Sequence, residues 1–192
     1  AGALAGFAPR YDAVIGQSLG GLTAIAVAAL RPELVGRLVL VDISPGFVMT
    51  PGPNPVRDFL AGIDSFGSRD EIVERALSFG FGPTRAHVVR GVFHNTRVRE
   101  DGRVVFKHHL ANLGDREAPF DTDFRPLWPL LDAVDVPVLL VRGAHGFVSE
   151  TMAEEFATRI EDSTVVTLPC GHNVQEDDPV ALAHVLRDFL GR

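Results

Sequence analysis

The 192-residue sequence predicts an α/β fold, in which strands of a parallel sheet alternate with helices. Short runs rich in Val, Ile and Leu recur at four places, and each run is typical of a buried strand. Helical segments separate these runs, and a strand, helix, strand order requires a crossover that leaves both strands parallel. Because 46% of the residues are apolar and 22% are charged, the chain can bury a core, which excludes a disordered or fibrous protein.

The first half of the chain contains two of these strands. Residues 11–16 (YDAVIG) form a β-branched run that ends in Gly, and residues 22–30 predict an Ala-rich helix that Arg31-Pro32 closes. Residues 38–43 (LVLVDI) form the second run and stop at a turn, Ser44-Pro45-Gly46. We therefore expect the helix to be a crossover between two parallel strands.

The last third of the chain repeats the pattern. Residues 136–141 (VPVLLV) and 164–168 (TVVTL) predict two more strands, with a helix over residues 151–160 between them. A final amphipathic helix over residues 179–190 begins with Asp178 as its N-cap and Pro at its first position. The sheet should therefore contain at least four parallel strands.

An insert of about eighty residues lies between the second and third strands, longer than a plain connection in a compact domain. Ser68 and Glu71 form a capping box that begins a helix ending at Ser78, and residues 83–95 predict another. Asp101-Gly102 indicates the turn of a hairpin. The insert also holds nine of the thirteen Phe residues.

We interpret the insert, residues 47–126, as a helical lid that contacts the substrate. The alternative is a helical cap whose Phe side chains only pack on one another. Residues 1–46 and 127–192 then form the α/β core.

Charge and composition exclude several classes of function. The formal net charge of −7 provides no basic surface for nucleic acid or anionic lipid. The single cysteine, Cys170, cannot form an intrachain disulfide, which fits a reducing compartment. No apolar stretch reaches the ~20 residues of a membrane helix, and the first residues lack the basic region of a secretory signal. We expect a cytoplasmic protein with a small-molecule substrate, no nucleic-acid or membrane partner, and an oligomeric state that the sequence does not indicate.

The candidate nucleophile is Ser18, within a G-x-S-x-G motif at residues 16–20. The predicted strand before it and helix after it are the context of a nucleophile elbow, where Gly16 and Gly20 are expected to remove Cβ clashes. Ser18 then lies at a helix N-terminus, where the backbone N–H of Leu19 can stabilise an oxyanion. The alternative is a Gly-rich turn with a solvated serine.

A serine nucleophile needs a base, and His172 is the best placed of the seven histidines. It follows the last strand directly, so its loop belongs at the sheet edge where Ser18 emerges. The neighbouring pair His108-His109 diverges in a strand or helix, with no carboxylate or Cys at ligand spacing. We therefore assign His172 as the general base and expect no metal.

These residues resemble the α/β-hydrolase superfamily, and within it the lid-bearing bacterial serine esterase and C–C hydrolase branch. The matching motifs are G-Q-S-L-G-G at residues 16–21, L-V-L-V-D at 38–42, V-P-V-L-L-V-R-G at 136–143, and Gly171-His172 with Asp178-Pro179 downstream. The resemblance covers essentially the whole chain. It implies an α/β-hydrolase fold and a Ser/His/acid triad that hydrolyses esters, thioesters or similar acyl groups, with no cofactor.

The acid of the triad departs from the usual pattern. In most members it lies three residues after the glycine that ends the strand before the penultimate helix, and that place is Gly146 here. Some branches take the acid from the strand that follows the nucleophile helix, where this chain has Asp42, 24 residues after Ser18.

We assign Asp42 as the acid, because a carboxylate there can orient Nδ1 of the histidine and stabilise its imidazolium form. One alternative is that Asp42 only ties down the turn at residues 44–46. The others are that Glu150 or Asp135 is the acid.

The N-terminus also departs from the superfamily, whose members begin with further strands and a loop that supplies a second oxyanion N–H. This sequence starts at Ala1 without such a loop. The resemblance implies the C-terminal portion of a longer hydrolase that lacks roughly 60 to 90 residues, at about 30 per βαβ unit. We expect the 192 residues alone to have little activity.

The expected function is cleavage of an ester or related acyl bond of a small, apolar substrate through an acyl-enzyme. Gln17, Phe47 and Phe147 are the expected substrate contacts. One alternative is hydrolysis of a C–C bond in a ring-cleavage product, whose carboxylate arginines of the insert would receive. Another is a non-catalytic ligand-binding relative, and a third is a half protein that completes its sheet with another chain.

Overall fold

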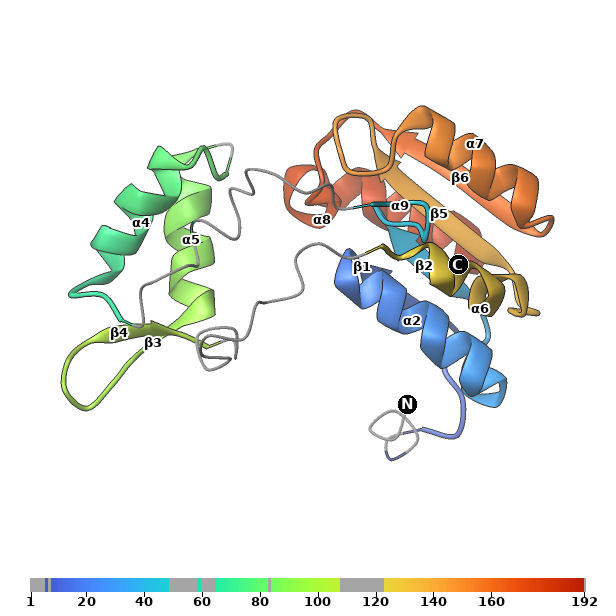
Figure 1. The fold of residues 1–192 in the computed structure, drawn as a ribbon, viewed down its shortest axis with the longest axis horizontal. Coiled ribbons are helices and arrows are strands. Elements are labelled where there is room, and N and C mark those ends of the chain that lie inside the picture. The colour runs from blue at the N-terminus through green and yellow to red at the C-terminus, as the bar shows by residue number, and fades with distance from the viewer. Residues whose placement is uncertain are drawn as a thin grey trace. The chain divides into compact units, whose positions relative to one another are not determined.

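The computed structural model describes residue 6 and residues 8–48, 59, 65–82, 84–107 and 123–191. The chain divides into two compact units (Figure 1). Unit 1 comprises Ala1–Met49 and Thr122–Arg192, and unit 2 comprises Thr50–Asp121.

Unit 1 contains a sheet of four parallel strands in the order β1-β2-β5-β6 (Figure 1). The strands are β1 (Val14–Gln17), β2 (Leu38–Val41), β5 (Val138–Gly143) and β6 (Ser163–Leu168). The prediction of an α/β fold with at least four parallel strands is confirmed. Because all four strands run the same way, their carboxyl ends share one edge of the sheet.

The first strand is shorter than the sequence predicts. Tyr11 forms only an isolated parallel bridge with Val35, and the regular ladder starts at Val14, which pairs with Leu38. The strand then extends one residue further than predicted, to Gln17. Gln17 is thus the last residue of β1 and pairs with Val41 of β2.

The helices of unit 1 cover both faces of the sheet. They are α2 (Leu19–Leu30), α6 (Trp128–Asp132), α7 (Glu150–Arg159), α8 (Val174–Asp177) and α9 (Pro179–Leu190), with short 3-10 turns at Pro32–Leu34 and Arg125–Leu127. The first helix begins three residues earlier than the expected range, directly after Ser18. Asp178 caps α9 as predicted, since its side chain accepts a hydrogen bond from Ala181 N.

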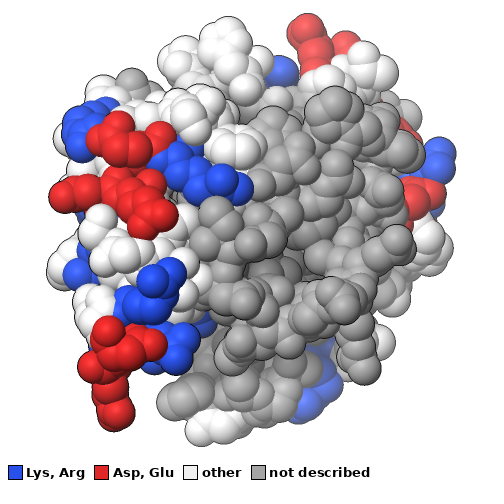
Figure 2. All heavy atoms as spheres, turned by 60° about the vertical axis from the view of Figure 1, so that its left-hand side comes forward, with Lys and Arg blue, Asp and Glu red and all other residues white. Residues whose placement is uncertain are grey.

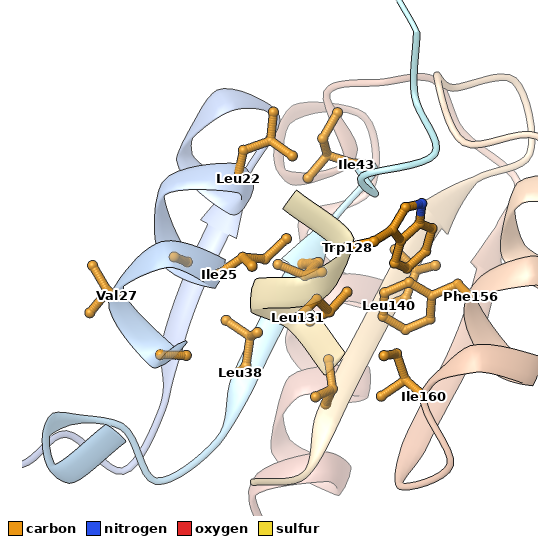
Figure 3. Close-up of a cluster of buried hydrophobic side chains, with 14 of the residues drawn as sticks. Leu22, Ile25, Val27, Leu38, Ile43, Trp128, Leu131, Leu140, Phe156 and Ile160 are labelled. Carbon is orange, nitrogen blue, oxygen red and sulfur yellow. The ribbon is translucent and has the colours of Figure 1, made fainter. Parts of the chain in front are cut away.

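Alternate residues of the strands face opposite sides of the sheet, which gives two cores. Leu38 packs with side chains of α2, α6 and α7 (Figure 3), and Leu40 belongs to the same buried cluster. Val39 and Val41 pack on the other face with side chains of α8 and α9. Every residue of β2 is therefore buried, which explains its uninterrupted apolar sequence.

Unit 2 contains two helices and a hairpin: α4 (Arg69–Ser78), α5 (Arg85–Asn95), β3 (Thr96–Val98) and β4 (Val104–Phe106). The predicted hairpin turn has Gly102 at φ 79°, a left-handed conformation that favours glycine. Ser68 caps α4 by accepting from Glu71 N, whereas the Glu71 carboxylate accepts from Gly67 N.

Many of the Phe side chains of unit 2 pack on one another. Phe59 makes edge-to-face contacts with Phe79, Phe81 and Phe106, and Phe106 also contacts Phe66. Phe66 belongs to a buried cluster that includes Ile72, Val88 and Val92, and Phe59, Phe81 and Phe106 pack against it. The helical-cap alternative accounts for these rings, and the lid role of residues 47–126 stays a prediction. His108, His109 and Phe120 lie outside the described residues.

Charged side chains of both signs are mixed on the described part of one face of the molecule. Figure 2 shows Lys and Arg side chains next to Asp and Glu side chains on one face. Two such pairs in unit 2 are Arg85 with Glu74, and Arg99 with Asp101. None of the helices that the structure describes has the length and apolar character required to cross a bilayer.

Candidate active site at the carboxyl edge of the sheet

The turn after β1 holds Ser18 in a rare backbone conformation. Its φ is 52° and its ψ is −128°, and it occupies the N-cap position of α2. Its N–H donates to Val41 O of the neighbouring strand at 3.1 Å. A non-glycine residue at positive φ costs free energy and persists only where the surrounding structure enforces it.

Two glycines make this turn possible, and only one of them, Gly16, is among the two that the motif predicts. A Cβ on Gly16 would lie 2.3 Å from the backbone oxygen of Gly20. A Cβ on Gly21 would lie 2.4 Å from the side chain of Ile43. A Cβ on Gly20 would meet no atom within 4 Å, so the expectation that Gly20 relieves a Cβ clash is wrong. Gly16 packs against the backbone of Gly20. Gly21 is therefore the second position, after Gly16, that cannot carry a side chain.

The turn after β2 holds Asp42, which is also at positive φ, 49°. Ser18 and Asp42 are the only non-glycine residues with positive φ among those described. Asp42 is fully buried, with an exposed fraction of 0%. Strain at two neighbouring strand ends is an observation that points to function.

The Asp42 carboxylate accepts hydrogen bonds from the loop that follows β5. The donors are the backbone N–H groups of Gly143 at 3.0 Å, Phe147 at 2.6 Å and Val148 at 3.4 Å. These donors offset the large cost of burying a carboxylate. The turn at residues 44–46 is closed by Ser44 Oγ, which accepts a hydrogen bond from Gly46 N. The alternative in which Asp42 only ties down this turn is therefore not needed to explain the turn.

His172 approaches Asp42 from the loop after β6. Its Nδ1 lies 2.8 Å from Asp42 Oδ2, and its side chain is 21% exposed. The ring of Phe147 stacks on the imidazole with a centroid separation of 3.7 Å and an interplanar angle of 18°. The imidazole is thus held at one edge by a carboxylate and on one face by an aromatic ring.

The other edge of the imidazole faces Gln17. The Gln17 Nε2 lies 3.1 Å from His172 Nε2 and donates to His172 O at 3.3 Å. Within the described part of the chain, Ser18 Oγ makes no hydrogen bond to His172, although Ser18 directly follows Gln17. The structure therefore joins Gln17, Asp42 and His172 by contacts and places Ser18 at the next backbone position.

A sequence model for the alpha/beta hydrolase fold matches residues 9–179 of the chain. The chain belongs to the alpha/beta hydrolase fold family. Over 95% of its length it is 36% identical to the esterase Rv0045c of Mycobacterium tuberculosis, and it spans 62% of that relative. It is 32% identical to the pimeloyl-[acyl-carrier protein] methyl ester esterase of Aromatoleum aromaticum, over 93% of this chain and 74% of the relative.

Solved structures agree with this assignment. A crystal structure of the M. tuberculosis esterase Rv0045c superimposes on the whole chain with a TM-score of 0.79 at 32% identity, and the chain covers 64% of that structure. The structure of E-2-(acetamidomethylene)succinate hydrolase, at 23% identity and a TM-score of 0.78, shows the same fold.

Gly146 explains how this α/β hydrolase accommodates Asp42. A Cβ at position 146 would lie 2.2 Å from Asp42 Oδ2 and 2.5 Å from its Cγ. The space where a side chain would begin at the family's usual acid position is therefore occupied by the Asp42 carboxylate. A carboxylate at Asp42 and any side chain at position 146 exclude each other in this backbone.

The loops that carry Asp42's donors and His172 pack backbone against backbone. Ala144 N donates to Leu168 O at 2.8 Å, and His145 N donates to Cys170 O at 3.0 Å. A Cβ on Gly143 would lie 2.2 Å from Gly171 O. This close approach fixes His172 relative to the loop that binds Asp42.

Sequence reasoning missed the backbone donors to Asp42, because N–H groups carry no side-chain signature. The sequence offered one signal, the two glycines Gly143 and Gly146. In the structure a Cβ at either position would clash with neighbouring atoms. Glu150 and Asp135, the alternative acids, are exposed, and neither is hydrogen-bonded to His172.

An aromatic stack extends from the imidazole. The ring of Phe147 lies 5.0 Å from Phe47, at an interplanar angle of 5°, and Phe47 lies 6.4 Å from Phe124. Phe147 is 45% exposed. The stack places accessible apolar surface directly beside His172.

Leu19 is the first residue of α2, where a backbone N–H has no acceptor within the helix. Cys170, two residues before His172, is a free thiol and is buried. Burial raises the pKa of this thiol, and the charges of Asp177, Asp42 and Asp178 add to the effect. No group of three or more His, Cys, Asp or Glu side chains suited to a metal ion occurs in the described ranges.

Proposed function

We propose that this α/β hydrolase is a serine hydrolase that cleaves an ester or related acyl bond of a small, apolar substrate through an acyl-enzyme. The observation that carries the proposal is the contact of His172 with the buried Asp42 carboxylate, beside the strained turn of Ser18. Similarity to two esterases supports the reaction class.

In the proposed mechanism Ser18 is the nucleophile and His172 is the general base. A nucleophile elbow at Ser18 is supported by the strand before it, the helix that begins after it and its positive φ. His172 Nε2 takes the proton of Ser18 Oγ as this oxygen bonds to the substrate carbonyl carbon. The carbonyl oxygen becomes an oxyanion, to which Leu19 N–H donates a hydrogen bond.

The tetrahedral intermediate then collapses to an acyl-enzyme. The bond from the carbonyl carbon to the leaving oxygen breaks, and the imidazolium of His172 gives its proton to that oxygen. A water molecule attacks the acyl group while His172 accepts one of its protons. The acid product leaves as the proton returns to Ser18, so the enzyme is restored.

Asp42 supports this cycle without exchanging a proton. Its Oδ2 accepts from His172 Nδ1, which directs the lone pair of a neutral imidazole to Nε2. Its charge also stabilises the imidazolium that forms when Ser18 is deprotonated. The backbone donors to the carboxylate hold it in place during both steps.

The substrate class follows from the surface beside the base. Phe147 and Phe47 present stacked rings next to His172, which favours an apolar acyl or leaving group. We also propose that Gln17 contacts the substrate and that residues 47–126 form a lid over it.

A second candidate is hydrolysis of a C–C bond in a ring-cleavage product. It is favoured by 28% identity, over 62% of this chain, to a 2-hydroxy-6-oxononadienedioate/2-hydroxy-6-oxononatrienedioate hydrolase of a Pseudomonas species. The esterase of M. tuberculosis is more similar and matches more of the chain. Parallel assays with p-nitrophenyl esters and with a 2-hydroxy-6-oxo dienedioate separate the two reactions.

The decisive test is labelling with a fluorophosphonate, in the protein expressed from the whole of its gene. Ser18 Oγ bonds to phosphorus, fluoride leaves and His172 takes the proton, so only an activated serine reacts. We expect stoichiometric labelling of Ser18, hydrolysis of short p-nitrophenyl esters, and loss of both in Ser18→Ala. An unlabelled protein would instead be the non-catalytic relative.

A further inference from the structure

We infer that Gln17 is a positioning residue that occupies the lone pair of His172 Nε2 in the resting site and must release it before Ser18 is deprotonated. The inference rests on the proposed role of His172 as the base. It assigns Gln17 a function through the imidazole, in addition to any contact with substrate.

The direction of the contact follows from the partners of the imidazole. Asp42 Oδ2 lies 2.8 Å from Nδ1 and can only accept, so a neutral imidazole carries its proton on Nδ1. Its Nε2 is then an acceptor, and the atom that faces Nε2 at 3.1 Å must be a donor. The amide nitrogen of Gln17 meets this requirement.

The second contact of Gln17 fixes the same orientation. The Gln17 Nε2 also lies 3.3 Å from the backbone oxygen of His172, which is an acceptor. A side-chain amide nitrogen carries two hydrogens and can donate to both atoms. If the amide were turned round, its oxygen would face the His172 oxygen, and both would lack a donor.

The two possible donors to Nε2 are consecutive residues. Gln17 ends β1 in regular strand geometry, and Ser18 follows at φ 52°. The nitrogen Nε2 has a single lone pair in the ring plane, so it accepts from the Gln17 amide or from the Ser18 hydroxyl, but not from both. The resting site therefore has a capped base.

Phe147 and Asp42 prevent the imidazole from turning away, so the Gln17 amide and the Ser18 hydroxyl must compete for Nε2 at one ring position. The ring is stacked on Phe147 at 3.7 Å, and Phe147 N and His172 Nδ1 share the same carboxylate oxygen. A hydroxyl that displaces the amide must therefore do so at the present ring position. In this exchange the Gln17 amide loses its hydrogen bond to Nε2. The loss lowers the equilibrium constant for the exchange by a factor of about two to ten.

The test is the rate of Ser18 labelling by a fluorophosphonate as a function of pH. Wild-type labelling and its absence in Ser18→Ala first establish the proposed function; an unlabelled wild-type protein overturns both. Gln17→Met removes the donor with little change in volume. We expect its plateau rate at high pH to rise about two- to tenfold. A plateau rate of Gln17→Met at or below that of the wild type would overturn the inference that Gln17 occupies Nε2 in the resting site.

Gln17→Glu gives a second, opposite change. A carboxylate at this position accepts from a protonated Nε2 and stabilises the imidazolium, so the pH of half-maximal labelling should rise by about one unit or more. The matched control is Gln175→Glu, because Gln175 is the other glutamine of the chain and lies three residues from His172. It adds the same charge without the contact, and its midpoint should stay within about 0.3 of the wild type.

The surrounding titratable groups are common to all these variants. Asp42 bonds the imidazole, Cys170 precedes it on the same loop, and Asp177 of α8 accepts from Gly171 N. Asp178 and His145 lie on the adjacent segments. Equal midpoints for Gln17→Glu and Gln175→Glu would mean that charge alone acts, which overturns the contact.

Discussion

The turns after β1 and β2 share one kind of backbone strain but differ in how their polar side chains are held. Both put a polar residue at positive φ at the carboxyl end of a parallel strand, Ser18 at 52° and Asp42 at 49°. Ser18 remains partly accessible and has no hydrogen-bond partner for its hydroxyl among the described residues. Asp42 is completely buried and accepts four hydrogen bonds.

The difference fits the two roles proposed for these residues at one sheet edge. The proposed nucleophile must reach the substrate, and the turn of Ser18 is held by backbone packing between Gly16 and Gly20. The proposed supporting carboxylate must keep its position and charge, and the turn of Asp42 is held through its own side chain. Loss of the side chain should therefore affect activity in both turns but stability in only one.

The largest effect is expected from comparing Ser18→Ala with Asp42→Asn. Either change should lower turnover of a p-nitrophenyl ester by about 10⁴-fold or more. Ser18→Ala should change the free energy of unfolding by less than about 0.5 kcal/mol, whereas Asp42→Asn should cost about 1 to 3 kcal/mol by leaving backbone donors unpaired. Urea unfolding with circular dichroism measures both, and full activity of Asp42→Asn would place the acid elsewhere.

Gly146→Ala sharpens the comparison at the loop that binds Asp42. The new Cβ would start 2.2 Å from Asp42 Oδ2, so the carboxylate or the loop must move. We expect a loss of about 1 to 3 kcal/mol in stability and a fall in turnover, because the bond to His172 depends on the same oxygen. Wild-type activity in Gly146→Ala would show that this loop tolerates a side chain.

The glycines of the first turn provide an internally controlled pair. Gly16→Ala places a Cβ against the Gly20 backbone and should destabilise the protein by about 1 to 3 kcal/mol. Gly20→Ala meets no atom within 4 Å and replaces a helical glycine, so it should stabilise by about 0.5 to 1 kcal/mol. Thermal melts of the two variants should move in opposite directions, and melts that move together would contradict the structure.

The smallest effect concerns Cys170, whose raised pKa predicts a weak pH dependence. The folded protein holds the thiol proton more firmly than the unfolded chain, whose thiol has a pKa of about 9. Its contribution to stability is therefore complete below pH 9 and is lost as the pH rises through the folded value. Iodoacetamide at pH 8 should modify Cys170 far more slowly than a free thiol, and Cys170→Ser should remove the dependence.

Local sequence features predicted much of the fold and the principal residues of the candidate site. Buried strands and capped helices leave short-range signals, and residues 38–43 and 179–190 were found because apolar periodicity and N-caps are local properties. Ser18 and His172 were identifiable for the same reason, since Ser18 directly follows a recognisable strand and His172 lies in the loop after another.

Only the tertiary structure decided which contacts these residues make. Asp42 and His172 are 130 residues apart in the chain, yet their side chains meet at 2.8 Å. The closeness of Gly146 to that carboxylate, the open space at Gly20 and the Gln17 contact likewise depend on segments that converge through packing. Sequence patterns reflect local requirements, namely the backbone hydrogen bonds of each segment and the burial of its apolar side chains. Which side chains of distant segments come within hydrogen-bond distance is decided by how the segments pack together.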